Sequence, residues 1–175
     1  FIFRRANDIQ DTDILIPRVD GHEAQRLTVE FWRAWLARGR YTGRWREMVH
    51  RSVLTLKLLT FEPTGAIVAA PTCSLPEAIS GVRNWDYRFT WMRDAAFTLY
   101  AFMRVGLTEE AGHFMEWIQA RTSELSPEGT PKIMYRLDGS HVIEEETLDH
   151  LDGYRGSRPV RVGNGAHHRL QLDIY

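Results

Sequence analysis

The residues from Asn84 to Asp94 form the densest set of side chains that could bind a polar ligand. The run holds four aromatic residues, two arginines and two aspartates, and an apolar helical pattern follows it. Trp91 offers a face that stacks on a sugar ring, Arg93 can donate to two adjacent hydroxyls, and Asp94 can accept from two more. The run equally fits a helix entrance with Asp94 as N-cap and Arg93 as its ion-pair partner, or a protein interface. Both interpretations stay open at this point.

A second group of basic residues lies in the glycine-rich loop between Gly153 and Gly165. It contains Arg155, Arg158 and Arg161. Such a loop could cradle phosphate, but it has neither Walker spacing nor a Lys-Ser/Thr end. We favour a rigid loop whose arginines hold neighbouring loops through carboxylates or carbonyl oxygens.

Other residues that could be catalytic or bind a metal lack the partners that this chemistry needs. Residues 144–146 are three successive glutamates, which is typical of a solvated face. His167 and His168 are too closely spaced to share a metal from one helix face, and no third ligand is evident. Cys73 has no paired signature, and no Gly-x-Ser-x-Gly elbow is present. We therefore expect no metal site and no nucleophilic hydrolysis.

The elements that must position these side chains are mainly helical. Apolar spacing predicts one helix after Asp20-Gly21, a second over 45–59, a third over 95–106 and a fourth from Thr108. The third is apolar on nearly every side, so we expect it to be buried all round, and the fourth is amphipathic. A buried helix joined by a short turn to a half-exposed one predicts concentric helical layers.

The helical periodicity is lost from residue 123 to residue 165. Residues 133–137 alternate between apolar and polar, Asp138-Gly139 predicts a hairpin-type turn, and residues 142–143 can form the returning strand. The remainder reads as loop, and a new helix begins near Ala166. The segment therefore reads as a loop and hairpin insertion.

Composition excludes several classes of partner. The 175 residues carry 22 basic and 23 acidic side chains, for a net charge of -1, which gives no electrostatic reason to expect nucleic acid or a membrane surface. No long apolar run offers a signal peptide or a transmembrane segment. The single cysteine excludes an internal disulfide, and a reduced cytoplasmic setting fits best.

Both ends of the sequence have the character of internal segments. The chain opens at Phe1 within an apolar pattern and has no initiator Met, and residues 170–175 read as helix with neither cap nor breaker. We therefore expect an internal piece of a longer protein.

Several long motifs are similar to those of one enzyme family. They occupy residues 52–57, 63–72, 74–77, 84–97 (NWDYRFTWMRDAAF) and 153–166 (GYRGSRPVRVGNGA). In this order they resemble glycoside hydrolase family 15, the family of glucoamylases and a group of bacterial trehalases, over about residues 44–175. The resemblance implies an all-α fold, part of an (α/α)6 toroid with a loop and hairpin insertion. Residues 1–43 would be the linker and linker helix from an N-terminal β-rich domain, and 44–175 the N-terminal part of the catalytic toroid.

The resemblance also assigns binding roles. The family's motif Tyr-x-x-Thr-Trp-x-Arg-Asp matches residues 87–94. By resemblance, Arg93 and Asp94 hydrogen-bond the nonreducing-end glucose of an α-glucoside, and Tyr87 and Trp91 line that subsite.

The later Arg-Pro-x-Arg-x-Gly element matches Arg158 and Arg161, which the family places on the active-site rim. The two glutamates that the family uses as catalytic acid and base are expected downstream of Tyr175. We therefore expect no catalytic residue within this chain, and no hydrolase activity from it alone. No metal or organic cofactor is required, because two carboxylates and a water suffice for inverting hydrolysis.

The implied partners are an α-linked glucose oligosaccharide or trehalose, and the remainder of the chain's own polypeptide. Two alternatives stay open: a disaccharide phosphorylase of similar toroid fold, in which phosphate replaces water, and a non-catalytic sugar-binding or assembly fragment. The sequence does not select which α-glucosidic linkage is cleaved.

Overall fold

A computed structural model describes residues 20–123 and 129–169 of the chain, which divides into two units, Phe1–Ala37 and Arg38–Tyr175. The described part of the first unit is helix α1, Gly21–Ala37. The Asp20 side chain accepts a hydrogen bond from the His22 backbone N–H at 3.0 Å, which stabilises the first turn. The helix predicted after Asp20-Gly21 is therefore confirmed.

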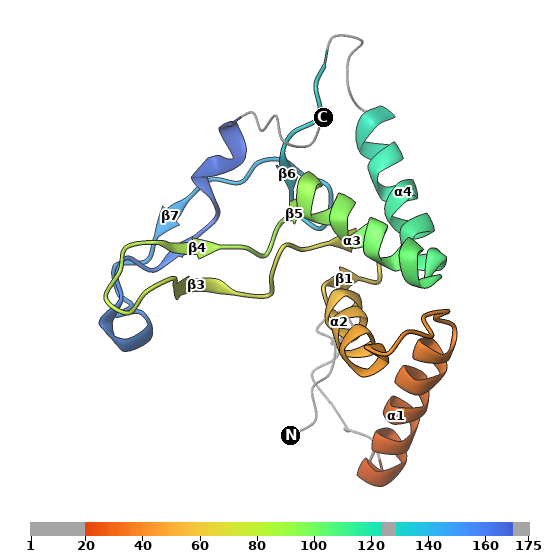
Figure 1. Cartoon of the computed structure of the whole chain (residues 1–175). Coiled ribbons are helices and arrows are strands. Elements are labelled where there is room, and N and C mark those ends of the chain that lie inside the picture. The colour runs from red at the N-terminus through yellow and green to blue at the C-terminus, as the bar shows by residue number, and fades with distance from the viewer. Residues whose placement is uncertain (1–19, 124–128, 170–175) are drawn as a thin grey trace, which may run out of the picture. The chain divides into compact units, whose positions relative to one another are not determined.

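The second unit contains three α-helices, eight short strands and two 3-10 helices within the described residues (Figure 1). In chain order these are α2 (Arg46–Leu58), β1 (Thr60–Phe61), β2 (Ala66–Ile67), β3 (Cys73–Pro76), β4 (Asn84–Asp86), β5 (Thr90–Trp91), α3 (Met92–Val105), α4 (Thr108–Ser123), β6 (Met134–Tyr135), β7 (Glu146–Thr147), η2 (Tyr154–Gly156), β8 (Arg161–Val162) and η3 (Gly165–His168).

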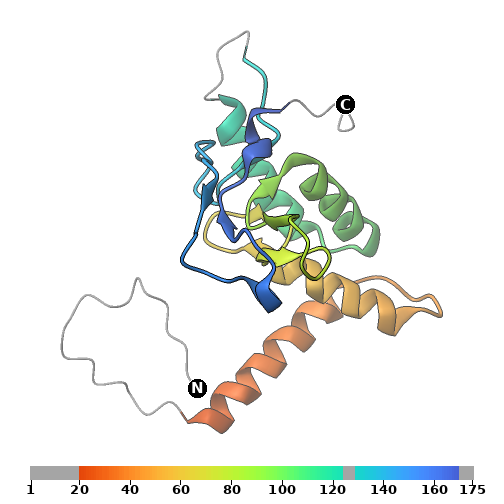
Figure 2. The ribbon, with the colours of Figure 1, turned by 90° about the vertical axis from the view of Figure 1, so that its left-hand side faces the viewer.

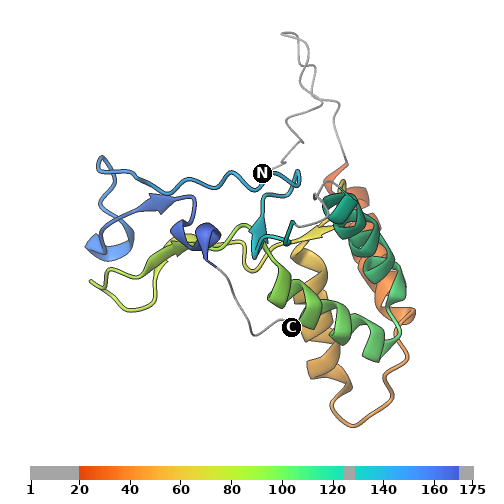
Figure 3. The same ribbon diagram turned by 90° about the horizontal axis from the view of Figure 1, so that it is seen from above.

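Helices α3 and α4 pack against each other and are joined by a tight turn (Figure 3). Gly106 ends α3 in the left-handed region, with φ of 82°, and its N–H bonds to carbonyls of the last turn. Leu99 of α3 and Phe114 and Trp117 of α4 belong to one buried apolar cluster, together with Ala66 and Ile67 of β2. The helices predicted at 45–59 and 95–106 and from Thr108 are thus confirmed.

The expectation that α3 is buried all round is wrong for the part of the chain that the structure describes. Ala95, Leu99 and Phe102 are buried on one side, whereas Phe97 and Tyr100 are 68% and 59% exposed. The described neighbours of α3 cover one side only, so the local sequence is more apolar than its surroundings here require.

An all-α fold class holds only in part, because the described residues also form four two-stranded antiparallel sheets. They are β1–β2, β3–β4, β5–β6 and β7–β8. The β3–β4 pair is a hairpin with an irregularity between Cys73 and Leu75, inside a segment rich in Pro, Ser and Thr. The two strands form because the backbone groups of each hydrogen-bond to those of the other. The spacing of apolar residues along the sequence does not indicate such a pairing.

The turn at Asp138-Gly139 is confirmed, but the returning strand is wrong. The Arg136 backbone N–H bonds to the Ser140 carbonyl at 2.7 Å, and Gly139 has φ of 91°. Residues 142–143 form no strand, and β6 instead pairs with β5, with Thr90 opposite Tyr135. A second apolar cluster, which includes Phe89, Trp91, Met134 and Ile143, favours this pairing, because these side chains are buried together in it.

Strand β8 lies against the β3–β4 hairpin, as Figure 2 shows from the side. The Ser74 hydroxyl joins them, since it donates to the Arg161 carbonyl and accepts from the Arg161 N–H, both at 2.6 Å. Where a helix is expected to start near Ala166, the described residues form only the 3-10 helix η3, which ends before an extended Arg169; the rest of that expectation falls on residues 170–175, outside the described residues. Among the described residues, no helix has the length and hydrophobicity to span a bilayer.

Candidate functional site

A pocket of about 400 Å³ lies between the β4–β5 segment and η3. Three aromatic residues, three polar or charged residues and two small residues line it: Trp85, Tyr87, Trp91, Glu145, Asn164, Arg169, Gly165 and Ala166. The rings of Tyr87 and Trp91 are 6.1 Å apart and tilted by 48°. Small-ligand sites typically combine such apolar walls with a few placed polar groups.

Burial raises the pKa of the Tyr87 phenol, and the nearby Glu77 carboxylate raises it further. The Tyr87 hydroxyl shares a hydrogen bond with the Glu77 carboxylate, and its oxygen can accept a further one. A hydroxyl of this kind is suited to a ligand that carries hydroxyl groups.

Strand alternation explains how β4 serves this pocket. Asn84 and Asp86 point to one side and are almost fully buried, whereas Trp85 between them points to the other side and lines the pocket. The buried side of β4 carries polar residues, so these need hydrogen-bond partners. The loop from Ser157 to Gly165 supplies acceptors for the Asn84 amide nitrogen and a donor for the Asp86 carboxylate, whereas the buried Asn84 Oδ1 has no hydrogen-bond partner among the described residues.

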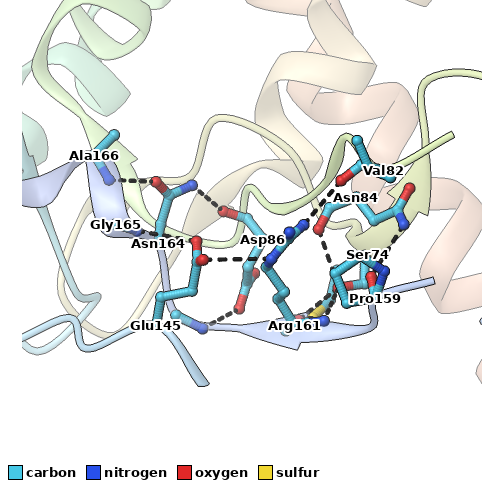
Figure 4. A network of polar contacts seen from close by, with 12 residues as sticks. Ser74, Val82, Asn84, Asp86, Glu145, Pro159, Arg161, Asn164, Gly165 and Ala166 are labelled. Carbon is cyan, nitrogen blue, oxygen red and sulfur yellow. Dashed lines mark hydrogen bonds and ion pairs between the residues drawn. The ribbon is translucent and has the colours of Figure 1, made fainter. Parts of the chain in front are cut away.

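The Asn84 amide holds the first part of this loop. Its Nδ2 lies 3.2 Å from the Ser157 carbonyl and 3.0 Å from the Pro159 carbonyl, contacts that Figure 4 shows in part. Its third acceptor is the Gly81 carbonyl at 3.2 Å. One amide therefore fixes the β3–β4 turn and the loop against each other.

Asp86 holds the later part of the loop. Its carboxylate accepts from the Arg88 guanidinium at 2.8 and 2.9 Å and from the Gly163 N–H at 3.2 Å. Burial of Asp86 works to raise its pKa, but the hydrogen bonds from Arg88 and Gly163 outweigh burial and leave the pKa below the ordinary value. The Asp86 carbonyl also accepts from the Asn164 amide at 3.0 Å.

Arg161 links the loop to two residues that line the pocket. Its Nε lies 3.3 Å from Glu145 Oε1, and its guanidinium carbon stands 4.8 Å from the centre of the Trp85 ring. Its Nη1 donates to the Val82 carbonyl at 3.0 Å. Glu145 accepts in addition from the Gly165 N–H at 3.2 Å, so it joins Arg161 to the start of η3 (Figure 4).

The structure brings together only part of the set of binding residues predicted from the sequence. Tyr87 and Trp91 line the pocket, and Arg161 contacts its lining. Arg93 and Asp94 follow Trp91 directly in the first turn of α3, joined by a 2.8 Å bond from Arg93 Nε to Asp94 Oδ1, but they lie outside the described lining of this pocket.

Arg158 lies apart from this group. It pairs with Asp152 and lines a separate hollow of about 220 Å³. The interpretation that the loop arginines hold neighbouring segments is thus confirmed for Arg161, which contacts Glu145 and Val82, whereas Arg158 pairs within its own stretch of chain. Neither guanidinium belongs to an open phosphate-binding cluster, because each is bound to a carboxylate.

Asp94 is not the N-cap of its helix. Helix α3 begins at Met92, the N-cap is Trp91, and Asp94 is the third helical residue. The reason is tertiary: Trp91 is held in an extended conformation by β6, and the Met92 N–H bonds to the Ile133 carbonyl at 3.0 Å. Asp94 still carries its negative charge in the first turn, where the helix dipole favours it.

Sequence reasoning missed Glu145 and Asn164 as residues of the pocket. Glu145 stands in a run of glutamates that was interpreted as a solvated face, and nothing local distinguishes it from its neighbours. Asn164 stands between two glycines, and an asparagine in such a position often caps a helix. Its Oδ1 does accept from the Ala166 N–H at 3.0 Å.

A larger hollow of about 800 Å³ lies among Asp86, Arg88, Arg136, Asp138 and Glu144, with other residues. Its arginines already have carboxylate partners, Asp86 for Arg88 and Asp138 for Arg136. The only aromatic rings among its described lining residues are Phe61 and Phe89. We therefore place the candidate site in the smaller pocket, which holds three aromatic faces.

The comparisons with known proteins agree on one family. The profile of the glycosyl hydrolases family 15 matches residues 43–175. The chain is 47% identical to a trehalase of Thermoplasma volcanium and 47% identical to a trehalase of Mycolicibacterium smegmatis, with 85% of the chain covered in each case. It is 34% identical to trehalase 2 of Sulfolobus acidocaldarius, over 87% of the chain.

The chain spans about a quarter of the length of these relatives: 23%, 22% and 26% respectively. No solved structure gives a significant match.

Proposed function

The chain belongs to glycosyl hydrolases family 15, and from this premise we propose that it forms the nonreducing-end glucose subsite of an inverting α-glucoside hydrolase. The observation that carries the proposal is the pocket lined by Trp85, Tyr87 and Trp91 together with a few polar groups, all within the matched region. The relatives named as trehalases support trehalose as the substrate, with glucoamylase-type α-linked oligosaccharides as the broader class.

In this proposal the aromatic lining of the pocket and the Arg93–Asp94 pair, which follows Trp91 outside that lining, act on different parts of the sugar. The faces of Tyr87 and Trp91 pack on the C–H surface of the ring. Arg93 and Asp94 supply a donor fork and a carboxylate acceptor for its hydroxyls. Both side chains are 35% exposed, so they can meet a ligand without first leaving a buried position. Arg158 and Arg161 belong to the rim, where the pairs that they form hold the loop.

The cleavage step needs two carboxyl groups with different tasks. One protonates the leaving oxygen, and the other activates a water on the opposite face of the ring, at a separation of roughly 6.5–9.5 Å. Glu145 lines the pocket, but Arg161 and the Gly165 N–H already engage its oxygens, so we assign it to positioning. We place the acid and the base in polypeptide that follows Tyr175. No metal or organic cofactor enters this scheme.

The same family premise gives the proposed architecture. Residues 44–175 would be the N-terminal part of an (α/α)6 toroid, and residues 1–43 a linker with its helix from a β-rich domain. The exposed apolar residues Phe97, Tyr100 and Met103 lie at helical spacing on α3, which supports a further helical layer as their cover. The partner is then the remainder of the same polypeptide, and the cytoplasmic setting inferred from the single cysteine belongs to this proposal.

The test is a comparison of substrates and variants in the complete polypeptide. Glucose release from trehalose, maltose and isomaltose identifies the linkage. Asp94→Asn and Arg93→Ala should each lower kcat/KM roughly 10- to 100-fold, because each removes a hydrogen bond that involves a charged group. Asp138→Asn and Arg46→Ala, at exposed positions away from the pocket, serve as matched controls.

Unchanged kcat/KM in both Asp94→Asn and Arg93→Ala would overturn the assignment of the glucose subsite. The 175-residue chain alone should release no glucose from any of the three substrates. Activity of that chain would contradict the placement of the catalytic pair.

A further inference from the structure

Two histidines and a glutamate meet beside the pocket. Glu144, His167 and His168 each offer one ligand atom, and these three atoms lie within 4.8 Å of one another. The register of β7 and β8 brings them together, because Glu146 pairs with Val162 and so places the preceding glutamates alongside residues 163–168. Gly165 N bonds to the neighbouring Glu145, which keeps the two segments in contact at this point.

One ring nitrogen of His167 already has a backbone partner, which leaves the other for a ligand. Its Nδ1 lies 2.9 Å from the Asn164 carbonyl oxygen. A carbonyl oxygen only accepts, so Nδ1 is the donor in this contact and Nε2 is the ring nitrogen left for a cation. Metal-binding histidines typically donate their other ring N–H to a carbonyl or carboxylate in this way.

Asn164 fixes this carbonyl in place. The residue is 5% exposed, its amide donates to the Asp86 carbonyl at 3.0 Å, and its Oδ1 accepts from the Ala166 N–H at 3.0 Å. His167 is therefore held by a buried and fully engaged residue rather than by a loose surface contact. The His167 ring is therefore oriented before any ion binds.

His168 supplies the second imidazole. Consecutive residues of an α-helix point to different sides, which is why the sequence argued against a shared ion. In η3 the two rings instead lie with their centres 3.6 Å apart. The absence of a third ligand, expected from the sequence, is also wrong, because Glu144 faces the pair. Among the described residues, no hydrogen bond or ion pair engages the Glu144 carboxylate.

We propose that Glu144, His167 and His168 bind a divalent transition-metal ion of the zinc type. Two imidazoles and one carboxylate form a ligand set that suits Zn²⁺ and leaves a fourth position for water. Ligands at about 2.0–2.1 Å from a tetrahedral ion lie about 3.3 Å apart, so no donor pair must close by more than about 1.5 Å. Glu144 and His168 are exposed and can make this adjustment by side-chain rotation.

A bound ion would tie the segment before β7 to η3, the two segments that contribute Glu145 and Ala166 to the pocket. The expected consequence is a more stable connection on that side of the pocket, and hence a higher Tm of the chain with metal.

The experiment is calorimetric titration of ZnCl₂ into the 175-residue chain, prepared without a histidine tag and in a buffer free of chelators. One ion per chain should bind, and Co²⁺ in its place should give the visible absorption of a tetrahedral complex. Glu144→Gln and His167→Ala should each weaken binding at least tenfold. His113→Ala removes an exposed histidine of α4 and should leave binding unchanged.

Circular dichroism of each variant shows whether it is folded. Glu144→Gln keeps the test decisive even if His167→Ala unfolds, because it changes one exposed side chain. The proposal is overturned if Zn²⁺ does not bind, or if Glu144→Gln binds as tightly as the unmodified chain. Equal weakening by His113→Ala would likewise overturn it, since the binding would then be unspecific.

Discussion

Arg161 Nε lies 3.3 Å from Glu145 Oε1. Arg161 belongs to β8, and Glu145 immediately precedes β7, the strand with which β8 pairs. The two side chains are 16% and 30% exposed, so water screens the pair only in part. The same guanidinium packs over Trp85, and the same carboxylate accepts from Gly165 N. The pair therefore connects one aromatic wall of the pocket to the start of η3.

A double-mutant cycle measures this connection. Arg161→Ala and Glu145→Ala should show a coupling free energy of about 0.5–1.5 kcal/mol in urea unfolding, above the value for an exposed ion pair. The matched control is Arg136 with Asp138, which lie 4.0 Å apart and are 52% and 69% exposed. Equal coupling free energies in both cycles would show that the Arg161–Glu145 contact stabilises the fold no more than an exposed ion pair does.

Asp86→Asn should change how stability depends on pH. The pKa of Asp86 is below its ordinary value of 3.8, so its ionised form stabilises the fold fully above that value. This contribution is lost as the pH falls through the lower pKa of the folded state. The difference in unfolding free energy between the unmodified chain and Asp86→Asn should be constant near about pH 6 and shrink below 3.8.

Urea unfolding at a series of pH values checks this. Asp138→Asn, an exposed aspartate, should show little difference at any pH. A difference between the unmodified chain and Asp86→Asn that grows on acidification would contradict the account of Asp86.

Gly163→Ala should destabilise the chain. Gly163 has φ of +76°, and a Cβ there would lie 1.7 Å from the Glu144 carbonyl oxygen, an impossible approach to backbone. An alanine at position 163 would strain the backbone there and push it away from Glu144. Both effects should lower the free energy of unfolding, by roughly 2 kcal/mol or more in total.

The matched control is Gly112→Ala, in helix α4. Beyond its chain neighbours and the backbone of its own helix, a Cβ there meets no atom within 4 Å. Alanine is the better helix former, so stability should rise by about 0.5–1 kcal/mol. The measurement is thermal or urea unfolding of both variants. A Gly163→Ala variant as stable as Gly112→Ala would contradict the close approach of the two backbones.

Lys57→Met should lower the free energy of unfolding, because it removes the cation paired with a buried carboxylate. Glu110 of α4 is 2% exposed, and Lys57 Nζ of α2 lies 3.1 Å from its Oε1. Removing one member of a buried pair costs about 3–5 kcal/mol, and Arg38, 3.7 Å from the other oxygen, should reduce that loss to roughly 2 kcal/mol. Urea unfolding checks the value. Arg46→Met, on an exposed part of α2, should change stability by less than about 0.5 kcal/mol.

The sequence by itself determined the helices and the types of side chain that could meet a ligand. Helix α2 and helix α4 form where apolar residues recur at helical spacing, and Gly106 ends α3 where expected. These features are predictable because a helix closes its hydrogen bonds within one short segment. The aromatic and charged residues of the run at 84–94, and the resemblance of this run to one family, are likewise visible in the sequence alone.

Only the tertiary structure decided which of these side chains meet. Thr90 pairs with Tyr135 and Glu146 with Val162, partners that lie far apart in the chain and that no local pattern specifies. The first pairing made Trp91 the N-cap in place of Asp94, and the second brought Glu144 and Glu145 to Asn164 and η3. A strand finds its hydrogen-bond partners in another segment, so its register depends on which distant apolar and polar groups can be buried together.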